Sequence, residues 1–162
     1  MTGLDKLDIV LKVVEDIPLL MPEILANNWP TLPLNEFPDM CGAGEGLQEK
    51  IIPDTFYFQS QRHNCFIHDV THTIFPPTAF GFHSSNLILL ANCLNTIRTK
   101  STSKVLKTLR EKRAITYYMG VETKTGFNCY MDREDGNIGQ FNYDPKLDIS
   151  FIKKLAQVGV SI

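Results

Sequence analysis

The densest group of reactive side chains in the sequence lies between residues 65 and 72, which read Cys-Phe-Ile-His-Asp-Val-Thr-His. Side chains three and four positions apart are neighbours on a helix, so a helix here would carry Cys65, His68, Asp69 and His72 on one face. A thiol, two imidazoles and a carboxylate are suited to general-base catalysis or to metal binding. A helical histidine is also often a hydrogen-bonded core residue, and spacing alone leaves both interpretations open.

A second predicted helix runs over residues 84–97, with Ser84 and Ser85 as candidate N-caps. Its apolar stripe begins with an amide. The stripe consists of Asn86, Leu90, Cys93 and Ile97. A buried amide needs hydrogen-bond partners, and a ring nitrogen on a facing helix would be one. The alternative is that Asn86 only caps the start of the helix.

Glycines alternate in residues 41–46, which read Cys-Gly-Ala-Gly-Glu-Gly. Such spacing lets the backbone turn its polar groups inward. A P-loop is excluded because no Gly-Lys-Ser/Thr follows. A dinucleotide fingerprint is excluded because the glycine spacing differs and Pro38 stands where a strand should enter. The interpretations that remain are a loop that offers carbonyls to a hard cation or N–H groups to an anion, and an ordinary turn.

Taken together, these motifs resemble the phospholipase A2 superfamily, in which a Cys-Gly-x-Gly loop precedes a Cys-x-x-His-Asp helix and an antiparallel helix brings a carboxylate to the histidine. Residues 41–44 and 65–69 match the first two motifs. The spacing is most similar to bacterial and phage phospholipase A2-like proteins with the pattern GxGxxEKxxPDT, and residues 44–55 read Gly-Glu-Gly-Leu-Gln-Glu-Lys-Ile-Ile-Pro-Asp-Thr. Residues 113–118 resemble the end of that group's long helix, so the resemblance covers about residues 41–120.

The resemblance implies calcium-dependent hydrolysis of a glycerophospholipid carboxylic ester. Calcium would bind the backbone carbonyls of Met40, Gly42 and Gly44 and the carboxylate of Asp69. Water or substrate phosphate would complete its 6–8 oxygen ligands. As the implied general base, His68 would take a proton from the attacking water. Calcium and the Gly42 N–H would stabilise the oxyanion.

Two residues depart from the family pattern. Asn86 stands where the family has a second catalytic carboxylate; it would orient His68 but would not stabilise a protonated ring as an ionised aspartate does. In a serine protease triad, the same change lowers turnover about 10⁴-fold. His72 stands where the family often has a tyrosine, and two hypotheses are open: it makes a similar hydrogen bond, or it changes the site. The resemblance also implies a disulfide between Cys41 and Cys65 if the compartment is oxidising.

Two other functions are open on the same residues. Residues 68–72 read His-Asp-Val-Thr-His, close to the zinc-hydrolase motif HExxH. Aspartate is one methylene shorter than glutamate, however, and His83 is the only later histidine. The second alternative is a catalytically silent calcium- or lipid-binding module, such as a toxin-like protein or a phage component, because Asn86 replaces a catalytic acid.

Residues 98–113 carry a net charge of +6 in a chain whose net charge is −2. The basic residues are Arg98, Lys100, Lys104, Lys107, Arg110, Lys112 and Arg113. A basic helix face attracts anionic lipid headgroups, so we expect a phospholipid or membrane surface as partner, with a merely solvated face as the alternative. Nucleic acid is not expected, because no aromatic side chains interleave with the charges. The apolar residues Val105, Leu106 and Leu109 are predicted to face the core.

The composition, with 162 residues, 43% hydrophobic and 21% charged, favours one mainly helical domain. The apolar periodicity predicts helices at 4–15, 62–75, 84–97, 104–119 and 148–158. Turn residues predict a small hairpin or a loop within 121–143. Together with the resemblance, these predictions divide the chain into a helical extension (1–40), a phospholipase A2-like core of antiparallel helices (41–120) and a C-terminal hairpin or loop with a closing helix (121–162).

No segment of the sequence predicts membrane insertion or export. The longest apolar run, residues 87–91, is far shorter than the roughly 20 residues of a membrane span. Residues 1–9 lack the basic start and cleavage site of a secretory signal. We expect a soluble protein, and the sequence leaves open whether it is secreted or associated with a phage.

Overall fold

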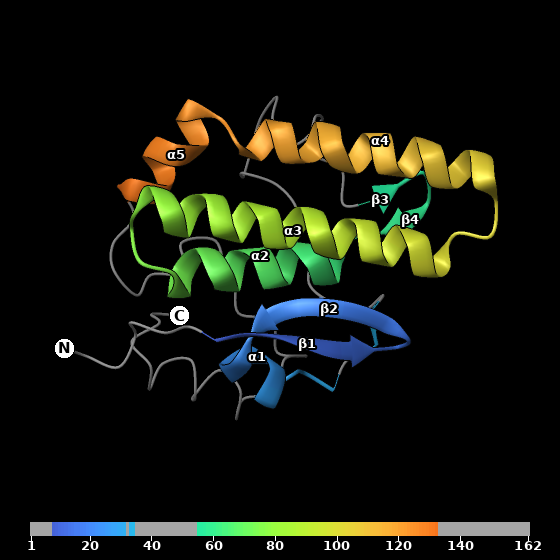
Figure 1. The fold of residues 1–162 in the computed structure, drawn as a ribbon, viewed down its shortest axis with the longest axis horizontal. Helices are drawn as coiled ribbons and strands as arrows, with labels where there is room; N and C mark the ends of the chain where they lie inside the picture. The colour runs from blue at the N-terminus through green and yellow to red at the C-terminus, as the bar shows by residue number, and fades with distance from the viewer. Residues whose placement is uncertain (1–7, 32, 35–54, 133–162) are drawn as a thin grey trace.

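Figure 1 shows the computed structural model, which describes residues 8–31, 33–34 and 55–132. The elements in chain order are β1 (Ile9–Val14), β2 (Ile17–Pro22), α1 (Glu23–Asn27), β3 (Thr55–Phe56), β4 (Gln59–Ser60), α2 (Arg62–Ile74), α3 (Ala79–Lys100), α4 (Lys104–Val121) and α5 (Lys124–Met131). The described chain is mainly helical, as predicted, with two antiparallel hairpins, β1–β2 and β3–β4. Helix α3 lies at the centre and packs against α2, α4 and β2 (Figure 1).

The N-terminal hairpin contradicts the helix predicted over residues 4–15. Strand β1 pairs antiparallel with β2, and Val14 lies opposite Ile17. Between the strands, Glu15 and Asp16 have φ angles of 47° and 67°, as a tight two-residue hairpin turn requires. The helix prediction was wrong because β1 is rich in branched apolar side chains, which favour strands. Within the predicted helical extension, the described residues contain one short helix, α1.

Two asparagines of α3 anchor the β1–β2 hairpin. The Asn92 side chain accepts a hydrogen bond from the Leu20 N–H at 2.7 Å and donates one to the Leu20 carbonyl at 2.8 Å. Asn95 donates to the Pro18 carbonyl at 2.9 Å. One face of β2 is buried in the core. Its buried residues are Ile17, Leu19 and Met21. The hairpin is thus fixed to the helix that carries Asn86.

Helix α2 confirms the helix predicted over residues 62–75. It ends at Ile74, two residues before Pro76 and Pro77, which cannot continue a helix. The chain then turns back, so that α2 and α3 run antiparallel (Figure 1). This reversal brings the first half of α3 against the second half of α2.

Helix α3 starts five residues earlier than predicted. Thr78 is its N-cap and accepts a hydrogen bond from the Gly81 N–H at 3.1 Å, which satisfies one of the free donors at the helix start. The predicted caps Ser84 and Ser85 therefore lie inside the helix. Asn86 also lies inside the helix, so it is not a cap.

Helix α4 begins where it was predicted, after the N-cap Ser103, whose hydroxyl accepts from the Leu106 N–H at 3.4 Å. The apolar residues that were predicted to face the core lie instead on the exposed side of α4. Val105 is 70% exposed, and Leu106 and Leu109 are each 38% exposed, so these residues do not face the core. The buried side of α4 is instead carried by Ala114 and by Tyr117.

Helix α5 stands where a hairpin or loop was predicted. Thr123 is its N-cap and accepts a hydrogen bond from the Gly126 N–H at 3.1 Å. A Cβ atom at Gly126 would lie 2.5 Å from the Val121 carbonyl, so glycine permits the tight corner between α4 and α5. The rest of the segment 121–143, from 133 on, and the predicted helix 148–158 lie outside the described residues. None of the helices described is long and apolar enough to cross a membrane.

Candidate functional site

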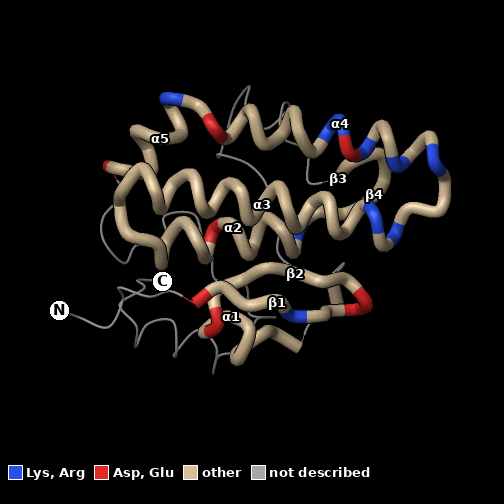
Figure 2. The backbone as a smooth tube through the Cα atoms, viewed as in Figure 1, with Lys and Arg blue, Asp and Glu red and all other residues tan. Residues whose placement is uncertain are grey.

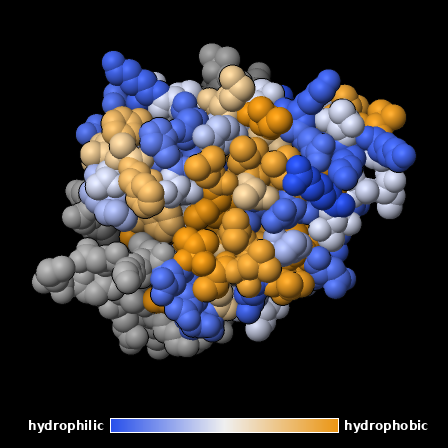
Figure 3. All heavy atoms as spheres, viewed as in Figure 1, coloured by the Kyte–Doolittle hydropathy of each residue, from blue (hydrophilic) through white to orange (hydrophobic). Residues whose placement is uncertain are grey.

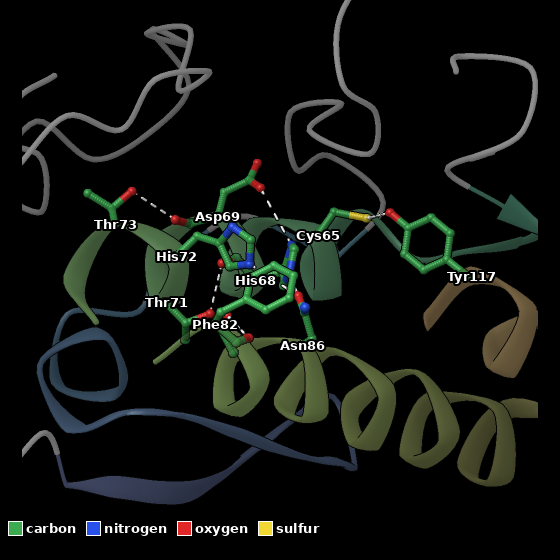
Figure 4. A network of polar contacts seen from close by, with 10 residues as sticks. Cys65, His68, Asp69, Thr71, His72, Thr73, Phe82, Asn86 and Tyr117 are labelled. Carbon is green, nitrogen blue, oxygen red and sulfur yellow. Dashed lines mark hydrogen bonds and ion pairs between the residues drawn. The ribbon is translucent and has the colours of Figure 1, made fainter. Parts of the chain in front are cut away.

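His68 and Asn86 form the centre of the candidate site, at the contact between α2 and α3 (Figure 4). Both side chains are buried. The His68 Nε2 atom lies 2.8 Å from the Asn86 Oδ1 atom. An amide oxygen only accepts hydrogen bonds, so the His68 ring donates from Nε2. The predicted pairing of the buried amide with a ring nitrogen on the facing helix is confirmed.

His72 shares the same acceptor. Its Nε2 atom lies 3.1 Å from Asn86 Oδ1, and the centroids of the His68 and His72 rings are 4.0 Å apart. The two lone pairs of the amide oxygen therefore accept from two imidazoles. His72 therefore makes a hydrogen bond with Asn86, and its role in a catalytic site stays a prediction.

The other end of the Asn86 amide reaches Glu122, which follows the last residue of α4. Asn86 Nδ2 donates to Glu122 Oε2 at 2.7 Å. The second oxygen of the carboxylate, Oε1, contacts Nδ1 of His83. A chain of polar contacts thus runs from two imidazoles through one amide to a carboxylate.

Burial lowers the pKa of His68 to about 4, and the hydrogen bond with Asn86 offsets part of that effect. The ring is therefore neutral at neutral pH. Its Nδ1 atom lies 3.8 Å from Asp69 Oδ1, too far for a hydrogen bond. A neutral ring that donates from Nε2 keeps a lone pair on Nδ1, which is the form that a general base requires.

Asp69 is the second chemically notable residue, and its side chain is 22% exposed. Its Oδ2 atom is buried and makes no hydrogen bond among the described residues. Burial raises the pKa of Asp69 to about 8. A buried carboxylate oxygen that lacks a partner is unstable as an anion unless a cation compensates it, so Asp69 fits the role of a calcium ligand.

The remaining ligands implied by the resemblance lie outside the described residues. These are the carbonyls of Met40, Gly42 and Gly44; the Gly42 N–H donor and Cys41 lie there too. Cys65 is disulfide-bonded, whereas Cys93 and Cys129 are free. A disulfide at Cys65 agrees with the resemblance, and its predicted partner is Cys41.

The zinc interpretation finds little support in this arrangement. The Nε2 atoms of His68 and His72 both contact the oxygen of the Asn86 amide. They are therefore engaged in hydrogen bonds and do not point together at a shared metal position. Over the described ranges, no group of three or more histidine, cysteine, aspartate or glutamate side chains is placed to hold a metal ion.

Helix α5 closes one side of the site with Tyr130. The Tyr130 ring lies 4.9 Å from the His72 ring, centroid to centroid. Its hydroxyl donates to the Pro76 carbonyl at 2.8 Å, which joins α5 to the turn between α2 and α3. Phe82 packs against the same two rings, with centroids 6.0 Å from His72 and 5.5 Å from Tyr130.

Sequence reasoning missed Glu122 and Tyr130. Both follow the end of α4, in the segment that was predicted to be a hairpin or a loop. A signal was present in Thr123 and Gly126, which have the N-cap and N3 spacing of a helix start. Without a helix there, no argument brought Glu122 to Asn86.

Comparisons of the chain with protein-family models, with curated proteins and with solved structures found no match.

Proposed function

We propose that this protein is a calcium-dependent hydrolase of glycerophospholipid carboxylic esters. The observation that carries the proposal is the placement of His68. Its Nε2 is bonded to Asn86, and its Nδ1 is turned toward the side of Asp69. Asp69 in turn has a buried oxygen without a partner among the described residues. A neutral base next to an uncompensated carboxylate suits attack by water beside a bound cation.

In this mechanism, His68 Nδ1 accepts a proton from the water that attacks the ester carbonyl. The Nε2–H bond to Asn86 keeps the ring oriented while it changes charge. Asp69, together with the carbonyls proposed from the resemblance, would hold calcium. When bound, calcium supplies positive charge to the developing oxyanion. His68 then returns its proton to the leaving alcohol, so the atoms balance as ester plus water to fatty acid plus lysophospholipid.

The test is release of fatty acid from phosphatidylglycerol vesicles, measured with calcium and with a chelator. We expect calcium-dependent release that falls by about 10³-fold in His68→Gln. The matched control is His63→Gln, because His63 is also a buried histidine of α2. Retained activity in His68→Gln, or equal loss in both variants, would contradict the proposal. An absence of release by the unmodified protein would also contradict it.

The alternative is a silent calcium-binding module, favoured by the amide at position 86. Calorimetric titration with calcium separates the two functions. The module is supported if the unmodified protein binds calcium but releases no fatty acid, and if this binding is lost in Asp69→Ala. The same titration with zinc tests the zinc interpretation, which predicts tight binding that is lost in His72→Ala.

We also propose that the outer side of α4 binds an anionic membrane. Figure 2 shows lysine and arginine gathered along α4 and the end of α3, and Figure 3 shows hydrophobic and hydrophilic residues side by side on the viewed face of the molecule. The exposed Val105 and Leu109 lie on the same helix as the exposed Lys104 and Lys112. Some of the basic residues serve other contacts. Among them are Arg98, bonded to Glu111, and Arg110, bonded to the carbonyls of Phe56 and Tyr57.

Cosedimentation with vesicles tests this surface. Each lysine near an anionic membrane contributes about 1 kcal/mol, so the double variant Lys104→Glu/Lys112→Glu should bind phosphatidylglycerol vesicles at least about 10-fold more weakly. The control is Lys12→Glu, because β1 lies in the layer opposite α4 (Figure 1). Equal binding to phosphatidylcholine vesicles, or no effect of the double variant, would exclude this surface.

A further inference from the structure

We propose that Glu122 is a positioning residue for His68, which acts by fixing the direction of the Asn86 amide. The geometry points to an amide and a carboxylate that together do the work of the second carboxylate missing at position 86. The inference rests on the proposed function for the role of His68, but the arrangement of the amide can be tested without catalysis.

The first step is the direction of the amide. An asparagine amide can turn by 180°, and the groups around it decide which end is oxygen. An ionised carboxylate only accepts hydrogen bonds. Glu122 Oε2 lies 2.7 Å from one end of the amide, so that end is the nitrogen. The oxygen must then face the rings of His68 and His72, at 2.8 and 3.1 Å.

The second step is the tautomer of His68. A neutral imidazole carries one proton, and the facing amide oxygen requires that proton on Nε2. The lone pair of Nδ1 is then free on the side of Asp69. If the amide turned round, its nitrogen would face both rings, and each Nε2 would have to accept. The proton of His68 would then move to Nδ1, and the proposed base would be blocked.

The third step is charge. Asn86 alone offers a protonated His68 only a dipole. The Glu122 carboxylate lies one hydrogen bond further on, and its side chain is 18% exposed, so it is partly shielded from water. Contact of its other oxygen with His83 restrains the carboxylate. The negative charge therefore stands behind the amide and stabilises the ring through it.

A merely structural role for Glu122 in the α4–α5 corner would leave the tautomer of His68 unchanged. The decisive readout is therefore the pair of ring ¹⁵N chemical shifts of His68 in the calcium-free protein at about pH 8, where an ordinary histidine is neutral. We expect the Nε2–H form in the unmodified protein and a mixture of tautomers in Glu122→Ala. The control is Glu111→Ala, which removes a carboxylate of α4 that bonds to Arg98 instead.

An exchange of the two groups gives a second test. In Asn86→Asp alone, the new carboxylate would face that of Glu122 at about the 2.7 Å that now separates Asn86 Nδ2 from Glu122 Oε2. This variant should therefore unfold at a lower temperature than the unmodified protein. Asn86→Asp combined with Glu122→Gln exchanges carboxylate and amide. In the double variant, we expect the Nε2–H form of His68 and the thermal stability to return.

Catalysis is the last readout. Removing a group that orients a metal-bound histidine typically lowers activity 10–100-fold. We expect a similar factor for the proposed base, so kcat should fall by about that much in Glu122→Ala and recover in the exchanged double variant. A pure Nε2–H form in Glu122→Ala together with unchanged kcat would overturn the inference. A tautomer that mixes in Glu122→Ala while even the unmodified protein releases no fatty acid would instead overturn the proposed function and leave the role of Glu122 standing.

Discussion

Helix α2 holds two buried histidines, His63 and His68, that share a lowered pKa and a contact with α3 but differ in what surrounds that contact. Burial lowers the pKa of His63 and of His68 to about 4. Each places Nε2 against an oxygen on α3. For His63 the oxygen is the hydroxyl of Thr96, at 3.1 Å; for His68 it is the amide of Asn86. A shifted pKa therefore does not distinguish a structural histidine from a candidate base.

The difference appears one bond further away. The Thr96 hydroxyl donates to the Asn92 carbonyl of its own helix at 2.8 Å, so the contacts of His63 end in the core. The contacts of His68 continue to Glu122, and its other ring nitrogen faces Asp69. What identifies the candidate site is a histidine placed between two carboxylates. The predictions below treat the surroundings of His63 as the control for those of His68.

The largest effect concerns stability at acid pH. Both histidines have a folded-state pKa near 4, below the ordinary 6.5, so the unfolded chain binds more protons between these values and stability falls as the pH is lowered from 6.5 to 4. The full shift corresponds to about 3 kcal/mol for each histidine. We expect His63→Gln and His68→Gln each to remove that share of the pH dependence, as measured by urea unfolding across this range.

Asp69 acts in the opposite direction over the same range, since its pKa is raised from 3.8 to about 8. The folded state keeps a proton that the unfolded chain releases, and stability falls as the pH rises from about 4 to 8. Without calcium, Asp69→Asn should therefore be more stable than the unmodified protein at about pH 8. Urea unfolding with and without calcium checks this. Added calcium should stabilise the unmodified protein but not Asp69→Asn. If Asp69→Asn is no more stable than the unmodified protein without calcium, Asp69 is not an uncompensated carboxylate.

A smaller effect is expected from filling the contact between α3 and α5. A Cβ atom at Gly81 would lie 2.3 Å from the Pro76 carbonyl and 2.5 Å from the Tyr130 hydroxyl. Gly81→Ala should therefore cost about 2 kcal/mol of unfolding free energy. It should also change the ring NMR signals of His72 but not those of His63. Equal changes at both rings would mean that the two ends of α2 are not independent. As a control, Gly120→Ala meets no atom within 4 Å.

The smallest effect is expected at the acceptor of His63. Thr96→Val removes the hydroxyl that lies 3.1 Å from both His63 Nε2 and Asn64 Nδ2. Losing a buried hydrogen-bond partner costs about 1–2 kcal/mol. We expect that loss of stability with no change in the tautomer of His68, in contrast to Glu122→Ala. A tautomer change in Thr96→Val would join the two regions into one network and weaken the comparison.

The sequence predicted the parts of the site that lie on regular helices. The i, i+3 and i+4 spacing placed His68 and His72 on one face, and the apolar stripe of α3 placed Asn86 toward them. Glu122 was not predictable in this way, because it lies at a corner where the direction of the chain depends on tertiary packing. The β1–β2 hairpin was missed because its apolar residues also fit a helical period, and the left-handed turn at Glu15 and Asp16 has no glycine to signal it.

Where β2 lies against α3, the outer edge of β2 is also protected from pairing with other chains. Successive residues of a strand direct their backbone groups to opposite edges, and the bonds of Leu20 with Asn92 show that Pro18, Leu20 and Pro22 face the edge away from β1. Proline has no N–H group, so Leu20 carries the single donor of that edge, and Asn92 occupies it. A free strand edge is a template for aggregation. This edge offers an incoming strand no donor, and exchanging either proline for valine would restore one.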